Sequence, residues 1–303
     1  MIMKYKNAYV LYANESYFDI VSTCAKSIRA FSELPIIVYL LNCDLIVGVG
    51  NSITRSWDCD IDDDEETQMY NMQGHDENFY VNRSSKRIYK LIKERPKIVK
   101  DALLNYADNV CYIDSDSVAT KHIDNVFNLF NKESIYPYFT NGIYEYLIMN
   151  GRGGADDPSN LTTTLEHPAC DLFGINQHNR RTYRTSNVFV AGINCIDFLD
   201  EWYWLCINPK VLSNPEFYAP FQEETIANVL LWKYEFNDGL PYVYTNGSLD
   251  RIDKVYKQFG FTGQTQMISD WFKIPEKEEY LLVFHGEKRI DIMKQMINKL
   301  KYV

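Results

Sequence analysis

The chain has 303 residues, of which 46% are hydrophobic and 15% aromatic, and its formal net charge at pH 7 is −10. This length and composition are sufficient for a full hydrophobic core in one large α/β domain or two small ones. The acidic balance argues against a nucleic-acid backbone as the main partner, because such a partner requires clustered lysine and arginine side chains.

The cysteines and the apolar segments bear on the cellular compartment. The seven cysteines are scattered and include no Cys-x-x-Cys pair, so we expect neither a disulfide framework nor a zinc site. The amino terminus has no long apolar signal core, and no later segment offers the roughly 18 uncharged apolar residues that a membrane span requires. We therefore expect a soluble, cytoplasmic protein with no membrane span.

The amino-terminal segment has the pattern of a β-α-β unit. Residues 8–13 and 35–41 are short apolar runs, which predict two buried strands. Between them, apolar residues recur at helical spacing over residues 17–31, and Asn14 or Ser16 is placed to cap that helix.

The pattern is looser over residues 42–85, which contain glycines and an acidic run at residues 58–66. This run includes two Asp-x-Asp triplets, but neither follows a buried apolar strand. A block of like charges is typical of a solvated loop. The run also lacks the glycine and the final spaced glutamate of an EF-hand calcium loop.

Residues 87–106 are the most basic stretch of the chain. Pro96 predicts the start of a fresh helix, because proline is tolerated in a first turn and disruptive further in. The apolar stripe of this helix consists of Ile98, Ala102, Leu103 and Tyr106. Lys97 and Lys100 lie near or opposite that stripe, as in an ordinary solvated lysine face.

A nearly continuous apolar run over residues 109–113 predicts a buried parallel strand, which stops at Asp114-Ser115-Asp116. Ligands of open α/β sheets bind beyond the carboxyl ends of the strands, so both carboxylates would reach that crevice. An unpaired buried carboxylate is costly, and two of them require a cation. Mg²⁺ or Mn²⁺ suits carboxylate oxygens and completes its shell with substrate phosphates. The alternative is a strand-end turn whose aspartates cap the next helix.

Long irregular segments alternate with short elements in the rest of the chain. Residues 135–184 show little periodicity, as is common in lids and binding loops. Residues 185–194 predict a strand, and residues 195–206 predict the helix that follows it.

Two further elements carry charged residues. Residues 221–232 predict a helix that begins with Glu223 and Glu224, where carboxylates also favour the helix dipole by roughly 0.3–1 kcal/mol. An apolar strand over residues 280–284 is followed directly by His285-Gly286-Glu287-Lys288.

The sequence Tyr112-Ile113-Asp114-Ser115-Asp116, followed by Ile123-Asp124-Asn125-Val126-Phe127, resembles the DxD segment of glycosyltransferases with the GT-A fold. The resemblance is strongest to glycosyltransferase family 8 and glycogenin-type enzymes, and it covers nearly the whole chain in order. It implies an α/β fold with a Rossmann-like, mainly parallel central sheet flanked by helices and irregular acceptor-side loops. Residues 1–303 would form one domain, with a nucleotide-sugar-binding half at 1–125 and an acceptor and catalytic half at 126–303.

The resemblance also implies a metal site and contacts to the diphosphate. Asp114, Asp116 and His285 would hold Mn²⁺ or Mg²⁺, while Gly286 and Lys288 resemble a shortened version of the family's diphosphate contacts. The helix before the DxD strand carries a basic residue that faces the donor in family 8. Lys97 resembles that residue, and Asp101 would contact the sugar.

Further donor contacts follow from the same resemblance. At the first strand end, Asn14 and Tyr17 match the spacing of two residues that contact the nucleotide base, beside Tyr12 and Ala13; a helix cap and a packed tyrosine would have the same pattern. The remaining expected contacts are Ser115, Ser186 and Asn187. Asn187 stands where the family has glycine.

The catalytic carboxylate is expected on the acceptor side. Glu224 precedes Asn228 by the family spacing, and Glu223 and Asp238 are the other candidates. The implied reaction moves a sugar from a nucleotide diphosphate sugar, chiefly a UDP-sugar, to a hydroxyl group of a glycan, protein or small molecule. Family 8 enzymes retain the anomeric configuration, but the undecided carboxylate leaves retention and inversion both open.

Two other functions remain open from the sequence. A sugar nucleotidyltransferase would also use a metal and a doubly wound sheet, but normally shows a glycine-rich basic signature near its first strand, which residues 13–16 lack. A non-catalytic carbohydrate-binding protein would need the aromatic side chains but no metal.

Overall fold

The computed structural model describes residues 4–60, 91–119, 123–128, 136–137, 186–208, 222–233, 243–244, 268–274, 279–284 and 289–300. The strands are β1 (Tyr5–Asn14), β2 (Ile36–Leu41), β3 (Ser52–Trp57), β4 (Ala107–Ile113), β5 (Ser117–Ala119), β6 (Tyr136–Pro137), β7 (Val188–Gly192), β8 (Val243–Tyr244), β9 (Ile268–Ile274) and β10 (Glu279–Phe284). The α-helices are α1 (Phe18–Arg29), α4 (Arg95–Asn105), α7 (Ile196–Cys206), α9 (Gln222–Lys233) and α11 (Arg289–Leu300), and the 3₁₀ helices are η1 (Glu15–Tyr17), η2 (Asp124–Asn128) and η4 (Ile193–Cys195).

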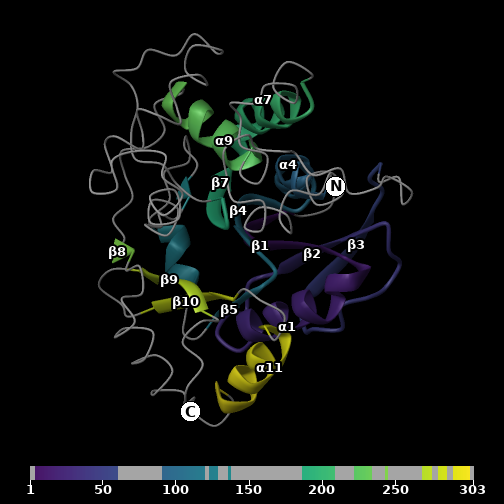
Figure 1. Cartoon of the computed structure of the whole chain (residues 1–303), viewed down its shortest axis with the longest axis vertical. Helices are drawn as coiled ribbons and strands as arrows, with labels where there is room; N and C mark the ends of the chain where they lie inside the picture. Colours follow the sequence, from purple (N-terminus) through teal and green to yellow (C-terminus); the bar gives the residue numbers. More distant parts are fainter. Residues whose placement is uncertain are drawn as a thin grey trace, which may run out of the picture.

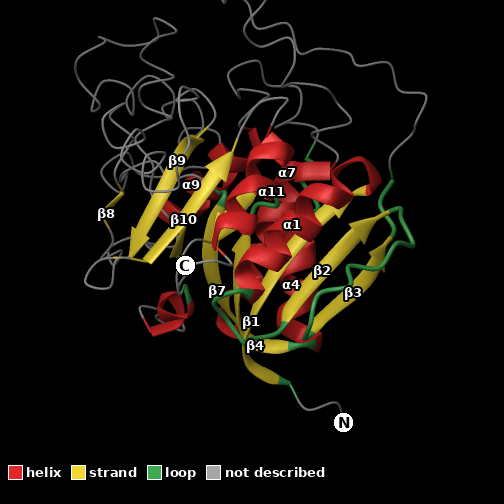
Figure 2. Ribbon diagram, turned by 90° about the horizontal axis from the view of Figure 1, so that it is seen from below, coloured by secondary structure: helices red, strands yellow, loops and turns green. Residues whose placement is uncertain are grey.

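Two sheets organise the described part of the chain. The larger one has six described strands in the order β3-β2-β1-β4-β7-β6 (Figure 2). Strands β3, β2, β1 and β4 pair in parallel, whereas β7 is antiparallel to both of its neighbours. The smaller sheet joins β5, β10, β9 and β8 in antiparallel pairs. The central sheet is thus mainly parallel, as predicted.

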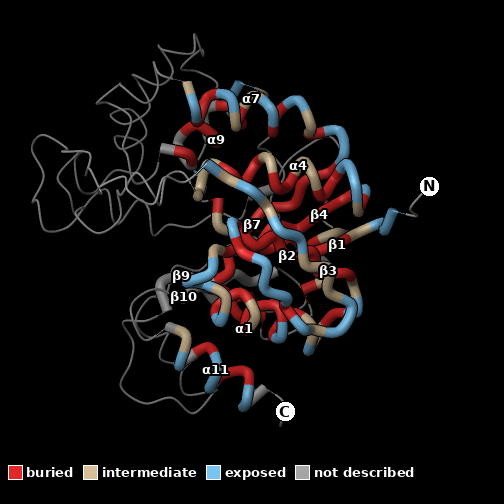
Figure 3. The backbone as a smooth tube through the Cα atoms, turned by 90° about the vertical axis from the view of Figure 1, so that its right-hand side faces the viewer, coloured by how far each residue is buried: buried red, intermediate tan, exposed pale blue. Residues whose placement is uncertain are grey.

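The strand sequences bury both faces of the central sheet. Successive side chains of a strand point to opposite faces, and in β1 Tyr9 and Leu11 enter one core while Ala8 and Val10 enter another. The first core is covered by α1 and α11, and the second by α4, α7 and α9 (Figure 1). Figure 3 shows the central strands as the buried middle layer between these helices.

The predicted strands and helices correspond to β1, α1, β2, α4, β4, β7, α7, α9 and β10. Strand β3 was missed because its sequence is polar and its side chains are partly exposed, so it lacks the apolar run of a central strand. Strand β9 and helix α11 were also not predicted, and β7 begins at Val188, three residues after the predicted start.

The topology brings three strand ends to one edge. Pairing in parallel places Asn14 beside Leu41, and Val10 beside Tyr112, so the carboxyl ends of β1, β2 and β4 lie together. The carboxyl end of α4 lies near the start of β1, where the Tyr5 amide donates to the Tyr106 carbonyl at 2.8 Å. Helix α4 therefore runs opposite to the strands, and its amino end lies at the same edge as their carboxyl ends.

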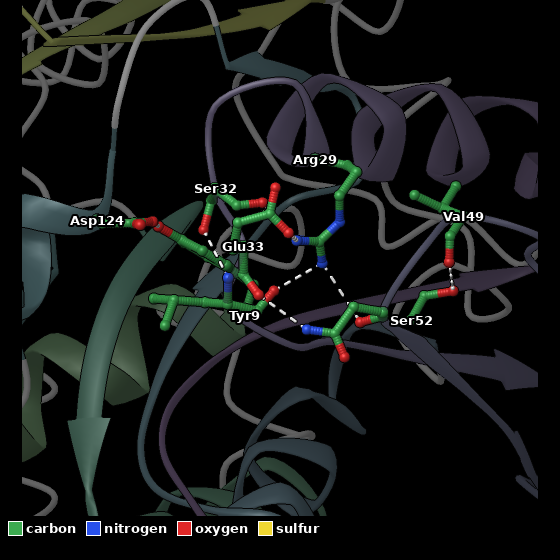
Figure 4. Close-up of polar contacts among 9 residues, drawn as sticks. Tyr9, Arg29, Ser32, Glu33, Val49, Ser52 and Asp124 are labelled. Carbon is green, nitrogen blue, oxygen red and sulfur yellow. Dashed lines mark hydrogen bonds and ion pairs between the residues drawn. The ribbon is translucent and has the colours of Figure 1, made fainter.

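Arg29 ties the end of α1 to the turn that precedes β2 (Figure 4). Its guanidinium donates to the carbonyls of Ser32, Leu34 (2.7 Å) and Asn51 (3.3 Å). Asn51 has a positive φ of 52°, and its side chain donates to the Glu33 carbonyl at 2.8 Å. Arg29 thus holds the connection between α1 and β2 next to the residue before β3.

Each helix in the described part of the chain is too short or too polar to cross a membrane.

We predict that Arg29→Met lowers the free energy of unfolding by about 2 kcal/mol, because hydrogen bonds from a charged donor contribute more than neutral ones. Methionine retains the aliphatic length but leaves the carbonyls without their donor. Urea denaturation measures the change, with the exposed Lys26→Met in the same helical turn as the control. Equal stabilities of the two variants would contradict this role of Arg29.

Candidate active site

A cavity of about 240 Å³ lies at the edge where the strands β1, β2 and β4 end. Ligands bind at this edge in open α/β sheets because the loops after the strands converge there. The lining residues come from these strand ends and from the segment that leads into α4: Tyr12, Ala13, Asn14, Tyr17, Leu41, Leu91, Ile92, Arg95, Tyr112, Asp114, Ser115 and Asp116.

The loop after β4 brings both aspartates of the DxD segment to the cavity. The Asp114 amide donates to the Asn187 carbonyl at 2.8 Å, which fixes the loop to the residue before β7. The Ser115 hydroxyl donates to the Tyr12 carbonyl at 2.5 Å, which fixes it to β1. With Ser115 turned inward and buried, the flanking side chains of Asp114 and Asp116 line the cavity.

Arg95, the first residue of α4, joins three elements at the base of the cavity. Its Nη2 donates to Asp114 Oδ1 at 3.1 Å, and its Nη1 donates to Glu223 Oε1 of α9 at 2.7 Å. Nη1 also donates to the Ser186 hydroxyl. The guanidinium lies over the Tyr112 ring, 5.0 Å from its centroid. Arg95 Nε is buried without a hydrogen-bond partner among the described residues.

This cluster holds two carboxylates against one cation, and its titration reflects that imbalance. Burial raises the pKa of Glu223 to about 7; Arg95 opposes the rise, and the nearby charge of Asp114 adds to it. Burial alone would lower the pKa of Arg95, but the charges of Glu223, Tyr112 and Asp114 hold it well above its usual value. Glu223 therefore takes up a proton near pH 7.

The cavity also has aromatic and apolar lining residues. Tyr12 and Tyr112 stack with their centroids 5.8 Å apart, the Tyr112 hydroxyl donates to Asp114 Oδ1, and Leu41, Leu91 and Ile92 supply apolar side chains. At the rim, Tyr17 is 38% exposed, and Asn14 Oδ1 accepts a hydrogen bond from the Ser16 hydroxyl at 2.9 Å. The predicted base contacts Asn14 and Tyr17 thus line one cavity with the predicted metal ligands.

The predicted donor contacts on α4 and before β7 lie outside the set of lining residues. Lys97 pairs with Glu94 at 3.0 Å, and Asp101 Oδ2 accepts a hydrogen bond from the Tyr39 hydroxyl at 2.7 Å. Ser186 contacts Arg95, and Asn187 contacts the DxD loop through its carbonyl. Their roles as donor contacts stay predictions.

Several predicted site residues lie outside the described residues: Asp238, His285, Gly286 and Lys288. Glu224 lies in α9, but its side chain is likewise not described. Of the predicted catalytic carboxylates, Glu223 is buried behind Arg95, where the Trp202 indole also donates to its carbonyl at 3.0 Å. Within the ranges that the structure describes, no group of three His, Cys, Asp or Glu side chains could hold a metal ion.

The sequence analysis did not single out Arg95. A signal was present, because a helix that precedes a parallel strand begins at the edge where that strand ends. The first residue of α4 is therefore better placed to reach the DxD loop than Lys97, which is two residues further along and on another side of the helix. The lining residues Leu41, Leu91, Ile92 and Tyr112 were also missed as cavity residues, since apolar and aromatic side chains predict only a core.

Comparison with known proteins supports the fold. No family model and no curated protein matches the chain. The solved apo structure of the bifunctional glycosyltransferase WbbM is similar over 99% of this chain, with a TM-score of 0.53 and 11% sequence identity. The chain spans 50% of the length of WbbM. This similarity confirms the predicted GT-A type of α/β fold.

A second solved structure is that of the galactosyltransferase LgtC in complex with donor and acceptor sugar analogues. It matches 74% of this chain and 70% of its own, with a TM-score of 0.38 and 15% sequence identity. The assignment of the fold therefore rests on the similarity to WbbM.

We predict that Arg95→Met lowers the free energy of unfolding by about 3–5 kcal/mol, because it leaves the buried carboxylate of Glu223 and the partly buried one of Asp114 without their cation. Chemical denaturation measures the change. Adding Glu223→Gln to that variant should restore part of the loss at a pH above 7, since it removes a buried group that must then either stay charged without a partner or take up a proton. No restoration in the double variant would contradict the charge balance described for the cluster. Lys100→Met, which breaks the exposed ion pair of α4 with Asp200, is the control and should cost less than about 1 kcal/mol.

The raised pKa of Glu223 predicts a pH dependence of stability. Between pH 4.5 and about 7 the folded chain keeps the proton on Glu223 while the unfolded chain releases it. The contribution of this group to stability is therefore complete below pH 4.5 and is lost as the pH rises through about 7. Denaturation of Glu223→Gln across this range should show a shallower decline with pH than the wild type. Parallel stability curves would show that Glu223 keeps an ordinary pKa.

Proposed function

We propose that this protein is a metal-dependent glycosyltransferase that moves a sugar from a UDP-sugar to a hydroxyl group of a glycan, protein or small-molecule acceptor. One observation carries the proposal: the two DxD carboxylates and a buried arginine meet at a cavity beyond the carboxyl ends of parallel strands. The proposal is supported by a fold similar to that of a solved glycosyltransferase and by the place of these residues, at the edge where open α/β sheets bind ligands.

The side chains at the cavity fit a divalent metal. Asp114 and Asp116 both line it, and carboxylate oxygens suit Mg²⁺ and Mn²⁺, which usually retain substrate phosphates in their shell. In this proposal Asp114 and Asp116 hold the metal together with His285. The bound metal would neutralise charge that develops on the diphosphate leaving group.

The remaining lining residues fit the other parts of a nucleotide donor. Tyr17 is an exposed ring at the rim, and Asn14 is a polar side chain beside it, so we assign the base to this end. Gly286 and Lys288 are proposed to contact the diphosphate. Leu41, Leu91 and Ile92 give the cavity an apolar wall, which excludes water from the polar contacts and so strengthens them.

Arg95 and Glu223 are proposed to orient the site. Arg95 lines the cavity and donates to Asp114, so its guanidinium can add positive charge near the reacting sugar. Glu223 accepts from Arg95 at 2.7 Å and is buried, a position suited to orienting the arginine. Glu224 and Asp238 then remain the proposed acceptor-side carboxylates, and the choice between them decides the stereochemical course.

Titration calorimetry of UDP into the purified protein, with and without Mn²⁺, tests the donor site. We expect binding that requires Mn²⁺ and that weakens at least roughly tenfold in Asp116→Ala, as loss of metal-site groups does elsewhere. Asp108→Ala removes an exposed carboxylate at the opposite end of β4 and should bind UDP as the wild type does. No UDP binding, or binding that is independent of both Mn²⁺ and Asp116, would overturn the proposal.

A further inference from the structure

The first turn of α4 is not well specified by its own sequence. Proline disfavours helical backbone at the residue before it, and Arg95 stands inside the helix immediately before Pro96. The N-cap residue Glu94 makes no side-chain hydrogen bond to the amides of the helix. Contacts from elsewhere in the fold must therefore hold this turn, and with it the start of the Arg95 side chain.

Glu94 makes those contacts although it is an acidic residue in the interior. Its side chain is 4% exposed, and Oε2 accepts from the Trp57 indole at 3.1 Å and from Lys97 Nζ at 3.0 Å. Lys97 Nζ also lies over two rings, 5.5 Å from the centroid of Trp57 and 4.8 Å from that of Tyr203. We call these four residues, Trp57, Glu94, Lys97 and Tyr203, the Glu94 clasp.

The clasp joins α4 to β3 and α7, neither of which supplies a hydrogen-bond partner to the Arg95 guanidinium. Trp57 ends β3, and its ring packs edge-on against Tyr39 of β2 at 5.6 Å. Tyr203 belongs to α7. The two neighbouring residues at the start of α4 thus reach in different directions, Glu94 to β3 and α7, and Arg95 to the DxD loop and α9.

We propose that Glu94 is a positioning residue for Arg95, and that the clasp fixes the first turn of α4 so that the guanidinium stays between Asp114 and Glu223. A buried carboxylate is costly unless it is paired and hydrogen-bonded. The first turn of α4 is therefore held where Glu94 keeps its contacts with Trp57 and Lys97. Lys97 then acts through Glu94 and need not contact the donor. The importance of this positioning for catalysis rests on the proposed function, whereas the positioning itself does not.

The Arg95 Nε–H group reports the position of the guanidinium directly. It is buried and has no hydrogen-bond partner among the residues that the structure describes, so its exchange with solvent depends on how often the cluster opens. Its signal in a ¹⁵N-correlated NMR spectrum is identified by its loss in Arg95→Lys. This measurement requires neither nucleotide nor metal.

We compare Glu94→Gln and Trp57→Phe with Lys100→Gln. Glu94→Gln removes the ion pair with Lys97, and Trp57→Phe removes the indole donor while keeping an aromatic ring against Tyr39. Lys100→Gln breaks a different ion pair of the same helix, with Asp200 at 2.6 Å. We expect exchange at Arg95 Nε to be on the order of tenfold faster in Glu94→Gln, to be faster to a lesser degree in Trp57→Phe, and to be unchanged in Lys100→Gln.

Wild-type exchange at Arg95 in both clasp variants would overturn the proposal. An equal acceleration in Lys100→Gln would also overturn it, because exchange would then follow general loosening of α4. If Glu94→Gln does not fold, Trp57→Phe alone decides between these results. Calorimetry with UDP and Mn²⁺ separates the two proposals: a wild type that binds no UDP refutes the proposed function, while the NMR comparison still decides whether Glu94 positions Arg95.

Discussion

The site depends on one buried cation. The single side chain of Arg95 contacts the DxD loop, the segment before β7 and helix α9. Two carboxylates in a largely buried setting would repel each other and lose their hydration, and the arginine between them offsets both costs. Burial raises the pKa of Glu223 to about 7, and Arg95 opposes that rise. The position of Asp114 at the cavity therefore depends on its ion pair with Arg95.

The parallel topology explains why these residues meet. Parallel strands end at one edge, and a helix that leads into such a strand begins at that edge, so the DxD loop and Arg95 come together although they lie on different elements. Antiparallel β7 then brings Ser186 and Asn187 to the same place from a distant part of the sequence. The cavity is therefore lined both by the carboxylates of the DxD loop and by aromatic and apolar side chains.

The sequence predicted the buried strands correctly, because a short apolar run has few other structural explanations. Apolar runs identified β1, β2 and β4, and the predicted strand that stops at Asp114 and Asp116 does end at a cavity, the place where ligands bind in open α/β sheets. Polar β3 was missed, since an edge strand does not require an apolar run. Arg95 was missed because its role depends on which side of α4 faces the cavity. Lys97 was preferred, but it forms an ion pair with Glu94, three residues earlier in the same segment. The sequence shows that Arg95 and Lys97 are both cations. The packing of α4 on β3 and α7 determines that Arg95 lines the cavity and that Lys97 lies against Trp57 and Tyr203.

Turnover of the donor tests the central claim most directly. The purified protein would be incubated with Mn²⁺ and a panel of UDP-hexoses and UDP-N-acetylhexosamines, and released UDP would be measured for the wild type and for Asp114→Asn. The proposed site predicts UDP release from at least one donor, dependent on Mn²⁺ and lost in Asp114→Asn. Release from no donor, or release that persists without Asp114, would contradict a glycosyltransferase site at this cavity.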